Sequence, residues 1–166
     1  SDARRVADYL KYFKDTGRVK ALFSSDLFFP RIRAASKEEA LAQICDSLVA
    51  RGVMREEDRE SLYHREQISS TEINPLVAMP HCLLGEGEKT SYAIFTTSQP
   101  VDWKHADVQL IIVALISKSD GIDRQLFPIV YRLTEDADKV ARLVDITDFD
   151  LFTEKLFSNL PTDIAM

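Results

Sequence analysis

A nearly unbroken apolar run from Val108 to Ile116 constrains the fold of this chain more than any other segment. Val, Leu and Ile dominate the run, and a short continuous stretch of such residues is typical of a strand that is buried on both faces. A strand of this kind must be covered by other elements on both sides. The run therefore predicts a layered domain with this strand at its centre.

Apolar spacing predicts further elements on both sides of this strand. Strands are expected at residues 22–29, as one or two short pieces, and at 76–81 and 92–95. Helices are expected at residues 4–14, 36–52, 56–65, 123–133, 138–145 and 149–157. Strands interleaved with helices in this proportion predict an α/β (α+β) fold, a single layered domain in which helices flank a mixed β-sheet.

Local signals at several element ends sharpen these predictions. Ser36 and Glu39 form a capping box at the start of one helix. Gly17 is expected to end the first helix, and Pro128 predicts a kink or a later start for the helix that contains it. The polar residues 68–75 read as a loop.

The length of 166 residues fits one domain with a short appendage. We expect residues 1–18 to form an N-terminal linker helix and residues 19–160 to form the domain. The start at Ser1, without an initiator methionine, indicates a processed terminus or a segment of a longer polypeptide, and we favour the segment.

Charge and composition limit the possible partners. The formal net charge of −6 argues against broad nucleic-acid binding by this chain. Cys45 and Cys82 lack the spacing of metal ligands, and Cys45 is expected to be a buried free thiol, which favours a reducing, cytoplasmic setting. No stretch is long and apolar enough to predict a membrane span.

His81 is the strongest candidate for chemistry. It follows the apolar residues 76–80, which predict a buried strand. Pro80 lacks a backbone donor, so we expect it to end this strand and turn the chain, holding His81 on a rigid backbone. A hydrogen-bonded structural histidine is the alternative, and these residues alone favour it.

Three groups of residues around His81 resemble a known family. Arg65 with Glu66, Ser70 with Thr71, and residues 77–81 are similar to the signature of fructose/mannitol-type IIA domains of the bacterial phosphoenolpyruvate-dependent sugar phosphotransferase system. Residues 36–40 and 101–108 also match that pattern. The resemblance covers residues from about 20 to 157 and implies a IIA mannitol/fructose-like fold.

The resemblance implies that His81 is a phosphoacceptor. In that family a histidine takes a phosphoryl group from the phosphocarrier protein HPr and usually passes it to a cysteine of a IIB domain. Phosphoryl transfer needs a nucleophile held in line and hydrogen bonds to the equatorial oxygens. A neutral imidazole can serve near pH 7, with no metal and no cofactor.

Four neighbouring residues are candidates for supporting this chemistry. Arg65 offers forked donors to phosphate and stays charged, although a surface ion pair is the alternative. Ser70 and Thr71 could donate hydroxyl groups to the phosphoryl group, or could only cap a turn. Glu66 is expected to orient Arg65. His64 could line a docking surface, but a solvated helix face is favoured.

Gln125 marks the main departure from the transport members of the family. Those members often carry a second histidine in the helix after the central strand, whereas residues 121–127 contain none and Gln125 or Arg124 stands in its place. This change disfavours efficient onward transfer. Residues 72–76 also look more like the IIA-like domains at the ends of BglG- and MtlR-type transcriptional regulators.

We therefore expect a IIA-like regulatory domain of a transcriptional antiterminator or activator, phosphorylated on His81 by HPr. Its partners would be HPr and a IIB domain or other domains of the same polypeptide. The alternatives are a transport component that relays phosphate to a IIB cysteine and a degenerate binding module that accepts no phosphate. The sugar, the sign of regulation and the oligomeric state do not follow from the sequence.

Overall fold

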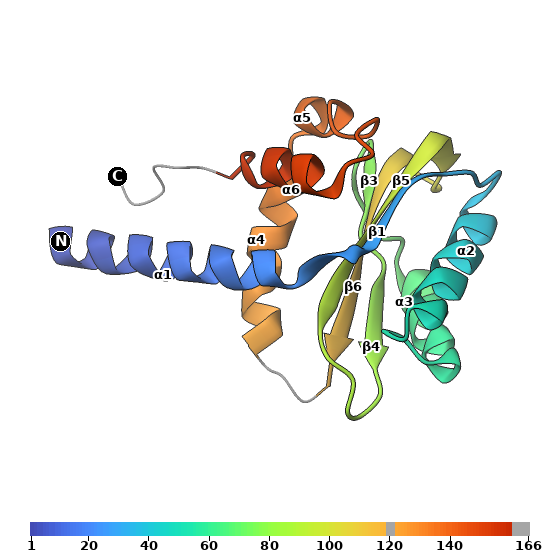
Figure 1. Cartoon of the computed structure of the whole chain (residues 1–166), viewed down its shortest axis with the longest axis horizontal. Coiled ribbons are helices and arrows are strands. Elements are labelled where there is room, and N and C mark those ends of the chain that lie inside the picture. Colours follow the sequence, from blue (N-terminus) through green and yellow to red (C-terminus); the bar gives the residue numbers. More distant parts are fainter. Residues whose placement is uncertain (119–121, 161–166) are drawn as a thin grey trace.

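A six-stranded mixed sheet lies between two layers of helices in the computed structural model (Figure 1). The structure describes residues 1–118 and 122–160, and of residues 122–125 it describes the backbone alone. The helices are α1 (Asp2–Ala21), α2 (Lys37–Ala50), the 3-10 turn η1 (Glu56–Asp58), α3 (Arg59–Ile68), α4 (Ile122–Thr134), α5 (Ala137–Ala141) and α6 (Phe149–Phe157). The strands are β1 (Phe23–Ile32), β2 (Glu72–Asn74), β3 (Val77–Ala78), β4 (His81–Leu84), β5 (Ser91–Asp102) and β6 (Asp107–Ser117).

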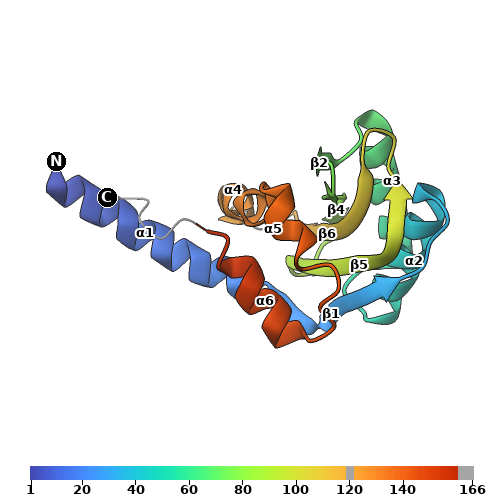
Figure 2. The same ribbon diagram turned by 90° about the horizontal axis from the view of Figure 1, so that it is seen from above.

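The sheet has the order β1-β5-β6-β3-β2, and β4 also pairs with β6. β1 runs parallel to β5, β6 is antiparallel to β5, and both β3 and β4 run parallel to β6. The predicted mixed sheet with β6 at its centre is confirmed. Helices α2 and α3 cover one face, while α4, α5, α6 and the end of α1 cover the other (Figure 2).

The two faces of the sheet bury two separate hydrophobic clusters. Along β6, Leu110 and Ile112 face the cluster beneath α4, and Ile111 and Val113 face the cluster beneath α2. This alternation follows from the two-residue period of a strand. It explains why the segment had to be apolar at nearly every position.

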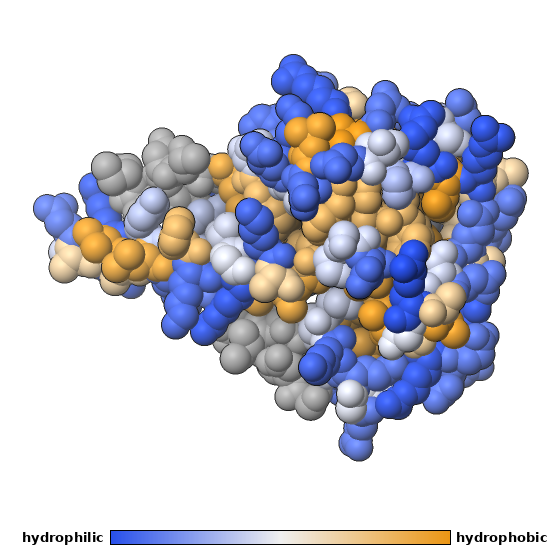
Figure 3. Space-filling view, in the orientation of Figure 1, coloured by the Kyte–Doolittle hydropathy of each residue, from blue (hydrophilic) through white to orange (hydrophobic). Residues whose placement is uncertain are grey.

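Helix α1 continues past the residue that was expected to end it. It runs through Gly17 to Ala21, and Val19 is fully buried. One glycine inside a helix costs about 1 kcal/mol, which packing of the C-terminal end of α1 against α4 offsets. The N-terminal part of α1 projects from the domain, with apolar side chains on its surface (Figure 3).

Strand β1 is longer than predicted. Its register against β5 shifts between Phe23 and Phe28, so the polar residues 24–26 form a bulge instead of separating two strands. Pro30 lies inside the strand, which an edge strand tolerates because one side of its backbone needs no partner.

The other helices differ from the predictions mainly at their ends. α2 begins after Ser36, whose hydroxyl accepts from the Glu39 amide at 3.1 Å, so this helix start is confirmed. The helix expected from residue 56 begins as η1 and continues as α3 to Ile68. α6 has the predicted bounds, whereas α5 is shorter than predicted, and α4 includes Pro128.

Pro80 does not turn the chain away from the sheet, as the sequence had suggested. Val77 lies opposite Leu110 and His81 lies opposite Ala114, so β4 continues the register of β3 along β6 without a shift. The Pro80 carbonyl accepts from the Ala114 amide at 2.9 Å. His81 is therefore the first residue of β4 rather than the exit of a strand.

Candidate functional site

His81 is held by its own backbone. Its Nδ1 atom lies 2.5 Å from the Met79 carbonyl oxygen. Because a carbonyl oxygen can only accept, Nδ1 carries the proton, and the lone pair of the neutral ring lies on Nε2. The contact supplies the acceptor that a nucleophilic imidazole needs to fix its tautomer.

Strand alternation places His81 on the face of the sheet that α4 covers. Val77 and Met79, at the same parity as His81, belong to the cluster beneath α4, whereas Cys82 belongs to the opposite cluster. The rings of His81 and Phe127 have centroids 5.0 Å apart. The imidazole is thus half-buried against an aromatic side chain of α4.

A cavity of about 310 Å³ lies beside His81 at the edge of the sheet. Its lining comes from α3, β4 and β6: Ser61, His64, Arg65, Ile68, His81, Leu83 and Ile116. The lining is mostly apolar, and its polar groups are the two imidazoles, the guanidinium and one hydroxyl. The cavity therefore brings the His81 imidazole and the Arg65 guanidinium to one space.

The environment of His81 favours its neutral form. Burial lowers the pKa of His81 below 6.5, and the nearby Arg65 guanidinium lowers it further, while the Met79 carbonyl and the Glu66 carboxylate oppose the change. The ring is therefore unprotonated near pH 7, as a nucleophile must be.

Arg65 lies on the rim of the cavity. Its Nη1 atom donates to the Ser69 carbonyl at 2.8 Å, at the C-terminal end of α3. This bond restrains one nitrogen of the guanidinium, whose fork has five donors in all. The structure thus brings Arg65 and His81 together, as the sequence predicted.

Helix α3 is fixed to β4 at the edge of the sheet. The Leu83 amide donates to Ser61 Oγ at 3.0 Å, and the Gly85 amide donates to Asp58 Oδ1 at 3.2 Å. The Cys82 thiol lies 3.4 Å from the Asp58 carbonyl oxygen. These bonds replace the ladder that a neighbouring strand would provide on that side, and they hold α3 beside His81.

Glu66 does not orient Arg65, contrary to our expectation. Its carboxylate accepts from the Thr71 hydroxyl and pairs with Lys37 Nζ at 2.8 Å. Successive residues on a helix point about 100° apart, so Arg65 faces the cavity while Glu66 points into the protein. Lys37 was missing from the predicted site.

Ser70 and Thr71 lie outside the lining of the His81 cavity. Ser70 accepts from Lys37 Nζ at 3.2 Å and donates to Glu72, and Thr71 is buried against Glu66. The Thr71 carbonyl accepts from the Met79 amide at 3.0 Å. These residues therefore support the backbone that orients His81, and their hydroxyl groups donate to Glu72 and Glu66 instead of facing the cavity.

Most of the chain matches the model of one protein family. Residues 21–159 match the model of the family described as "Phosphoenolpyruvate-dependent sugar phosphotransferase system, EIIA 2". The chain belongs to this family. Its match includes every site residue discussed above, so the resemblance noted in the sequence is confirmed.

Two curated relatives of this EIIA 2 domain are regulators. The "Probable licABCH operon regulator" of Bacillus subtilis is 28% identical over 146 residues, which are 85% of this chain and 23% of that protein. The "Transcriptional regulator ManR" of the same species is 24% identical over 131 residues, 78% of this chain and 20% of that protein. The chain thus spans less than a quarter of either relative.

Another relative of the EIIA 2 domain is a component of a PTS system. The "PTS system 2-O-alpha-mannosyl-D-glycerate-specific EIIABC component" of Escherichia coli is 25% identical over 153 residues, 81% of this chain and 23% of that protein. Both kinds of relative therefore contain this domain as one part of a longer chain.

Solved structures show the same fold. The crystal structure of IIA mannitol from Escherichia coli matches with a TM-score of 0.69 at 20% identity, covering 81% of this chain and 98% of the other. The IIA–phosphorylated IIB mannitol complex from that species matches with a TM-score of 0.67 at 21% identity, over 82% and 97% of the two chains. The predicted IIA mannitol-like fold is confirmed, and a protein with this fold is seen there bound to a IIB partner.

Gln125, predicted at the position of a second histidine, lies in the first turns of α4, and its side chain is outside the described residues. His105 is exposed in the turn between β5 and β6. Cys45 and Cys82 are both buried and free. Burial raises the pKa of the Cys82 thiol to about 12, which keeps it protonated.

Part of the cavity lining was not predicted from the sequence, although a signal was present. Ser61, His64, Arg65 and Ile68 have the spacing of one helix face, so Arg65 marks the whole stripe as facing His81. Leu83 and Ile116 became apparent only from the sheet register.

The described part of the chain contains neither a candidate metal cluster nor a candidate membrane span. Residues 1–118 and 122–160 contain no group of three His, Cys, Asp or Glu side chains that could hold a metal ion. Within the same residues, no helix has the length and apolarity needed to cross a membrane.

Proposed function

We propose that His81 accepts a phosphoryl group through Nε2 and that the phosphorylated domain controls a transcriptional regulator of sugar use. The observation that carries the proposal is the Nδ1 contact with the Met79 carbonyl, because it leaves Nε2 as the nucleophilic atom of a neutral ring. A regulatory role is supported by the two regulators among the relatives.

The proposed donor is the phosphohistidine of HPr. The Nε2 lone pair of His81 attacks phosphorus, the bond from phosphorus to the HPr imidazole breaks, and that imidazole keeps the electron pair. Arg65 donates to the equatorial oxygens, where charge collects in the loose transition state. The protein supplies position and charge, and the reaction needs neither a metal nor a cofactor.

Phosphorylation would act on the rest of the polypeptide through charge. The phosphoryl group adds about 1.5 to 2 negative charges and three acceptor oxygens at a half-buried site. Neighbouring domains of the same chain that dock beside α3 and β4 would be attracted or repelled accordingly. The supply of phosphoenolpyruvate and sugar would set the phosphorylated fraction, which places the proposed function in the cytoplasm.

The second candidate function is relay of the phosphoryl group to a IIB cysteine. It is favoured by the EIIABC relative and by the solved complex of a IIA protein with phosphorylated IIB. The two functions share the chemistry at His81 and differ in the fate of the phosphoryl group. A degenerate module without phosphate would lack that chemistry altogether.

The test is phosphoryl transfer in a defined system. The chain is incubated with phosphoenolpyruvate, enzyme I and HPr, and acid-labile phosphate is measured by mass and by ³¹P NMR. We expect one phosphate on the wild-type chain and on His105→Ala, and none on His81→Ala. Equal labelling of His81→Ala would rule out the assigned nucleophile, and an unlabelled wild-type chain would support the degenerate module.

Adding a IIB domain to the purified phosphorylated chain separates regulator from relay. A regulator should retain its phosphate for minutes in the presence of IIB, whereas a relay component should lose it within seconds.

A further inference from the structure

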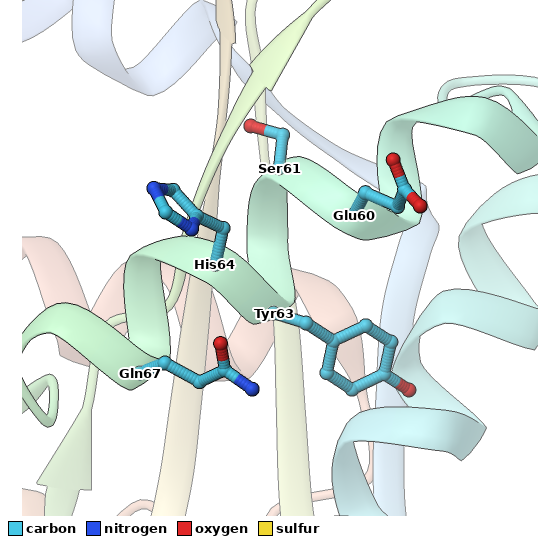
Figure 4. Close-up of a pocket in the computed structure, with 5 residues that line it drawn as sticks. All are labelled: Glu60, Ser61, Tyr63, His64 and Gln67. Carbon is cyan, nitrogen blue, oxygen red and sulfur yellow. The ribbon is translucent and has the colours of Figure 1, made fainter.

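His64 lies on the same side of the site as the proposed nucleophile. It is on α3, one helical turn after Ser61, and both side chains extend to the same side of the helix, away from Tyr63 (Figure 4). Both residues line the cavity that also contains Arg65 and His81. Two imidazoles from different elements therefore open onto one small space.

His64 is also accessible from outside this space. It is exposed, and together with Glu60, Ser61, Tyr63 and Gln67 it lines a second, more open cavity of about 500 Å³. The ring can therefore exchange protons with water. It stands where a group entering the His81 cavity from solvent would pass.

The position of His64 relative to His81 is fixed by the bonds between α3 and β4. Ser61, on the same helix face as His64, accepts from the Leu83 amide at 3.0 Å, and Leu83 is two residues after His81 on β4. Helix and strand therefore cannot move apart without breaking this bond. The bond therefore restrains the two backbone segments that carry the imidazoles.

We infer that His64 is a phosphate-binding residue of this site, which as an imidazolium donates a hydrogen bond to the phosphoryl oxygens on His81. The inference rests on the proposed function, because it assigns a partner to the phosphoryl group. Charge-assisted bonds of this kind are short and strong when both partners are held in place. Arg65 and His64 would then bind the same group from adjacent positions of α3.

The charges around His64 allow it to take up a proton when the phosphoryl group arrives. Glu60, one turn earlier on α3, brings a negative charge near His64, and Arg65 beside it brings a positive charge. From β4 the facing titratable group is His81, which is neutral before the reaction. The phosphoryl dianion changes this balance toward a protonated His64.

The consequence is a site whose phosphate retention depends on pH near neutrality. Protonated His64 stabilises phospho-His81, so the equilibrium with phospho-HPr should favour the chain more at pH 6.5 than at pH 9. Arg65 stays charged over that range and cannot produce such a change.

The test compares His64→Gln with His105→Gln in the whole chain. His105 is a matched control, because it is exposed and precedes Asp107, which lies roughly 23 Å along β6 from the residue opposite His81 at about 3.3 Å per residue. Both substitutions change an exposed imidazole, and equal thermal midpoints would verify that both variants fold. The phosphorylated fraction is measured against limiting phospho-HPr at pH 6.5, 7.5 and 9.

For His64→Gln we expect the equilibrium constant to fall about tenfold at pH 6.5 and to change little at pH 9. His105→Gln should match the wild-type chain at every pH. Imidazole NMR gives a second readout, since the chain has only three histidines. The ring resonances of His64 should shift when His81 is phosphorylated, and those of His105 should stay unchanged.

The possible outcomes distinguish the role of His64 from the proposed phosphorylation of His81. A wild-type chain that takes up no phosphate overturns both. If the wild-type chain is phosphorylated, His64→Gln matches His105→Gln and the His64 ring resonances do not change, only the role of His64 is overturned. If His64→Gln lost phosphate retention equally at every pH, the role of an imidazolium at His64 would also be contradicted, because that pattern indicates a structural role that does not depend on charge.

Discussion

The Met79 carbonyl decides which nitrogen of His81 can react. At the residue scale, three groups prepare the proposed reaction: the Met79 carbonyl, the His81 imidazole and the Arg65 guanidinium. The carbonyl fixes the tautomer, burial keeps the ring neutral, and Arg65 supplies positive charge without competing for the proton. Catalytic power would come from this placement, since the reaction itself needs little covalent assistance.

The rate of phosphorylation should depend on the protonation of His81. The protonated ring has no lone pair on Nε2, so the rate falls as pH drops through the pKa of the folded protein, which burial places below 6.5. Initial rates with phospho-HPr between pH 5 and 8, beside an NMR titration of the His81 ring, measure both quantities. Two midpoints that differ, or a ring that titrates above 6.5, would contradict this account.

Replacing Arg65 by Gln should have two effects at the same residue. Loss of the cation raises the pKa of His81, because Arg65 lowers it in the wild-type chain. It also removes the charged donor to the phosphoryl oxygens, which should slow phosphorylation about 100-fold at pH 7.5. Arg33→Gln is a suitable control, since Arg33 lies outside the cavity. A rate within threefold of wild type would exclude a role for Arg65 in phosphoryl transfer.

The two cysteines should be inert in the folded chain. Burial raises the pKa of both thiols, and that of Cys82 reaches about 12, so almost no thiolate exists at pH 8. We expect no reaction with a disulfide reagent under native conditions and two thiols per chain in denaturant. Fast native labelling of Cys82 would contradict this expectation.

At the scale of the elements, the site depends on a buried network that ties α2 and α3 to β2 and β3. Lys37 at the start of α2 pairs with Glu66 of α3, Glu66 accepts from Thr71, and the Thr71 carbonyl accepts from the Met79 amide. The chain of contacts ends at the residue that orients His81. Lys37, which is outside the lining of the His81 cavity, thus supports the backbone that orients His81.

Removing Lys37 should destabilise the whole domain. In Lys37→Met the Glu66 carboxylate, with a side chain only 4% exposed, loses its counter-ion, which should cost about 3 kcal/mol of unfolding free energy. The double variant Lys37→Met/Glu66→Gln should recover most of that loss. Lys89→Met, at an exposed lysine, serves as the control in urea denaturation. Equal midpoints for the three variants and wild type would show that the pair contributes nothing.

The elements differ in how well the sequence predicts them, for physical reasons. β6 and α2 were predictable because each carries a complete local signal, an apolar run in one and a capping box in the other. Gly17 was misleading because tertiary packing outweighs its helix propensity. Pro80 was misleading because the sheet partner of this segment, which lies more than thirty residues later, keeps its register in place.

The candidate site was partly predictable for the same reason. His81 and Arg65 belong to a motif, so residue type and spacing identify them. The partners of Glu66 depend on which way α3 faces, and that is set by packing against β4 and not by any local pattern. Ser61 and His64 could have been found from Arg65 by helical spacing alone.

On the scale of the whole molecule, the domain and the projecting part of α1 are unequal in their contribution to stability. Val6, Leu10 and Phe13 are 57%, 58% and 69% exposed, whereas Val19 is fully buried. The fold therefore depends on the last turns of α1 and not on its first half. Packing of α1 against the core begins at Tyr12, and the linker boundary after residue 18 stays a prediction.

Deleting residues 1–10 should leave the stability of the domain nearly unchanged. The deleted side chains are exposed, so we expect the thermal midpoint to move by less than about 2 °C. Val19→Ala removes buried methyl groups, and should lower the midpoint by roughly 4 to 8 °C. A large loss on deletion, measured by calorimetry beside Val19→Ala, would mean that the exposed face of α1 has a partner within the domain.

The unbroken register from β3 to β4 has a consequence for how a phosphoryl group on His81 could be recognised. The ladder to β6 and the bond from the Ala114 amide to Pro80 keep the main chain at this position in place. The two states of the domain would then share one shape and differ in surface potential. A partner that distinguishes them must respond to charge, and such interactions are screened beyond about 8 Å at physiological ionic strength. We therefore expect the preference of any partner for one state to weaken as salt concentration rises.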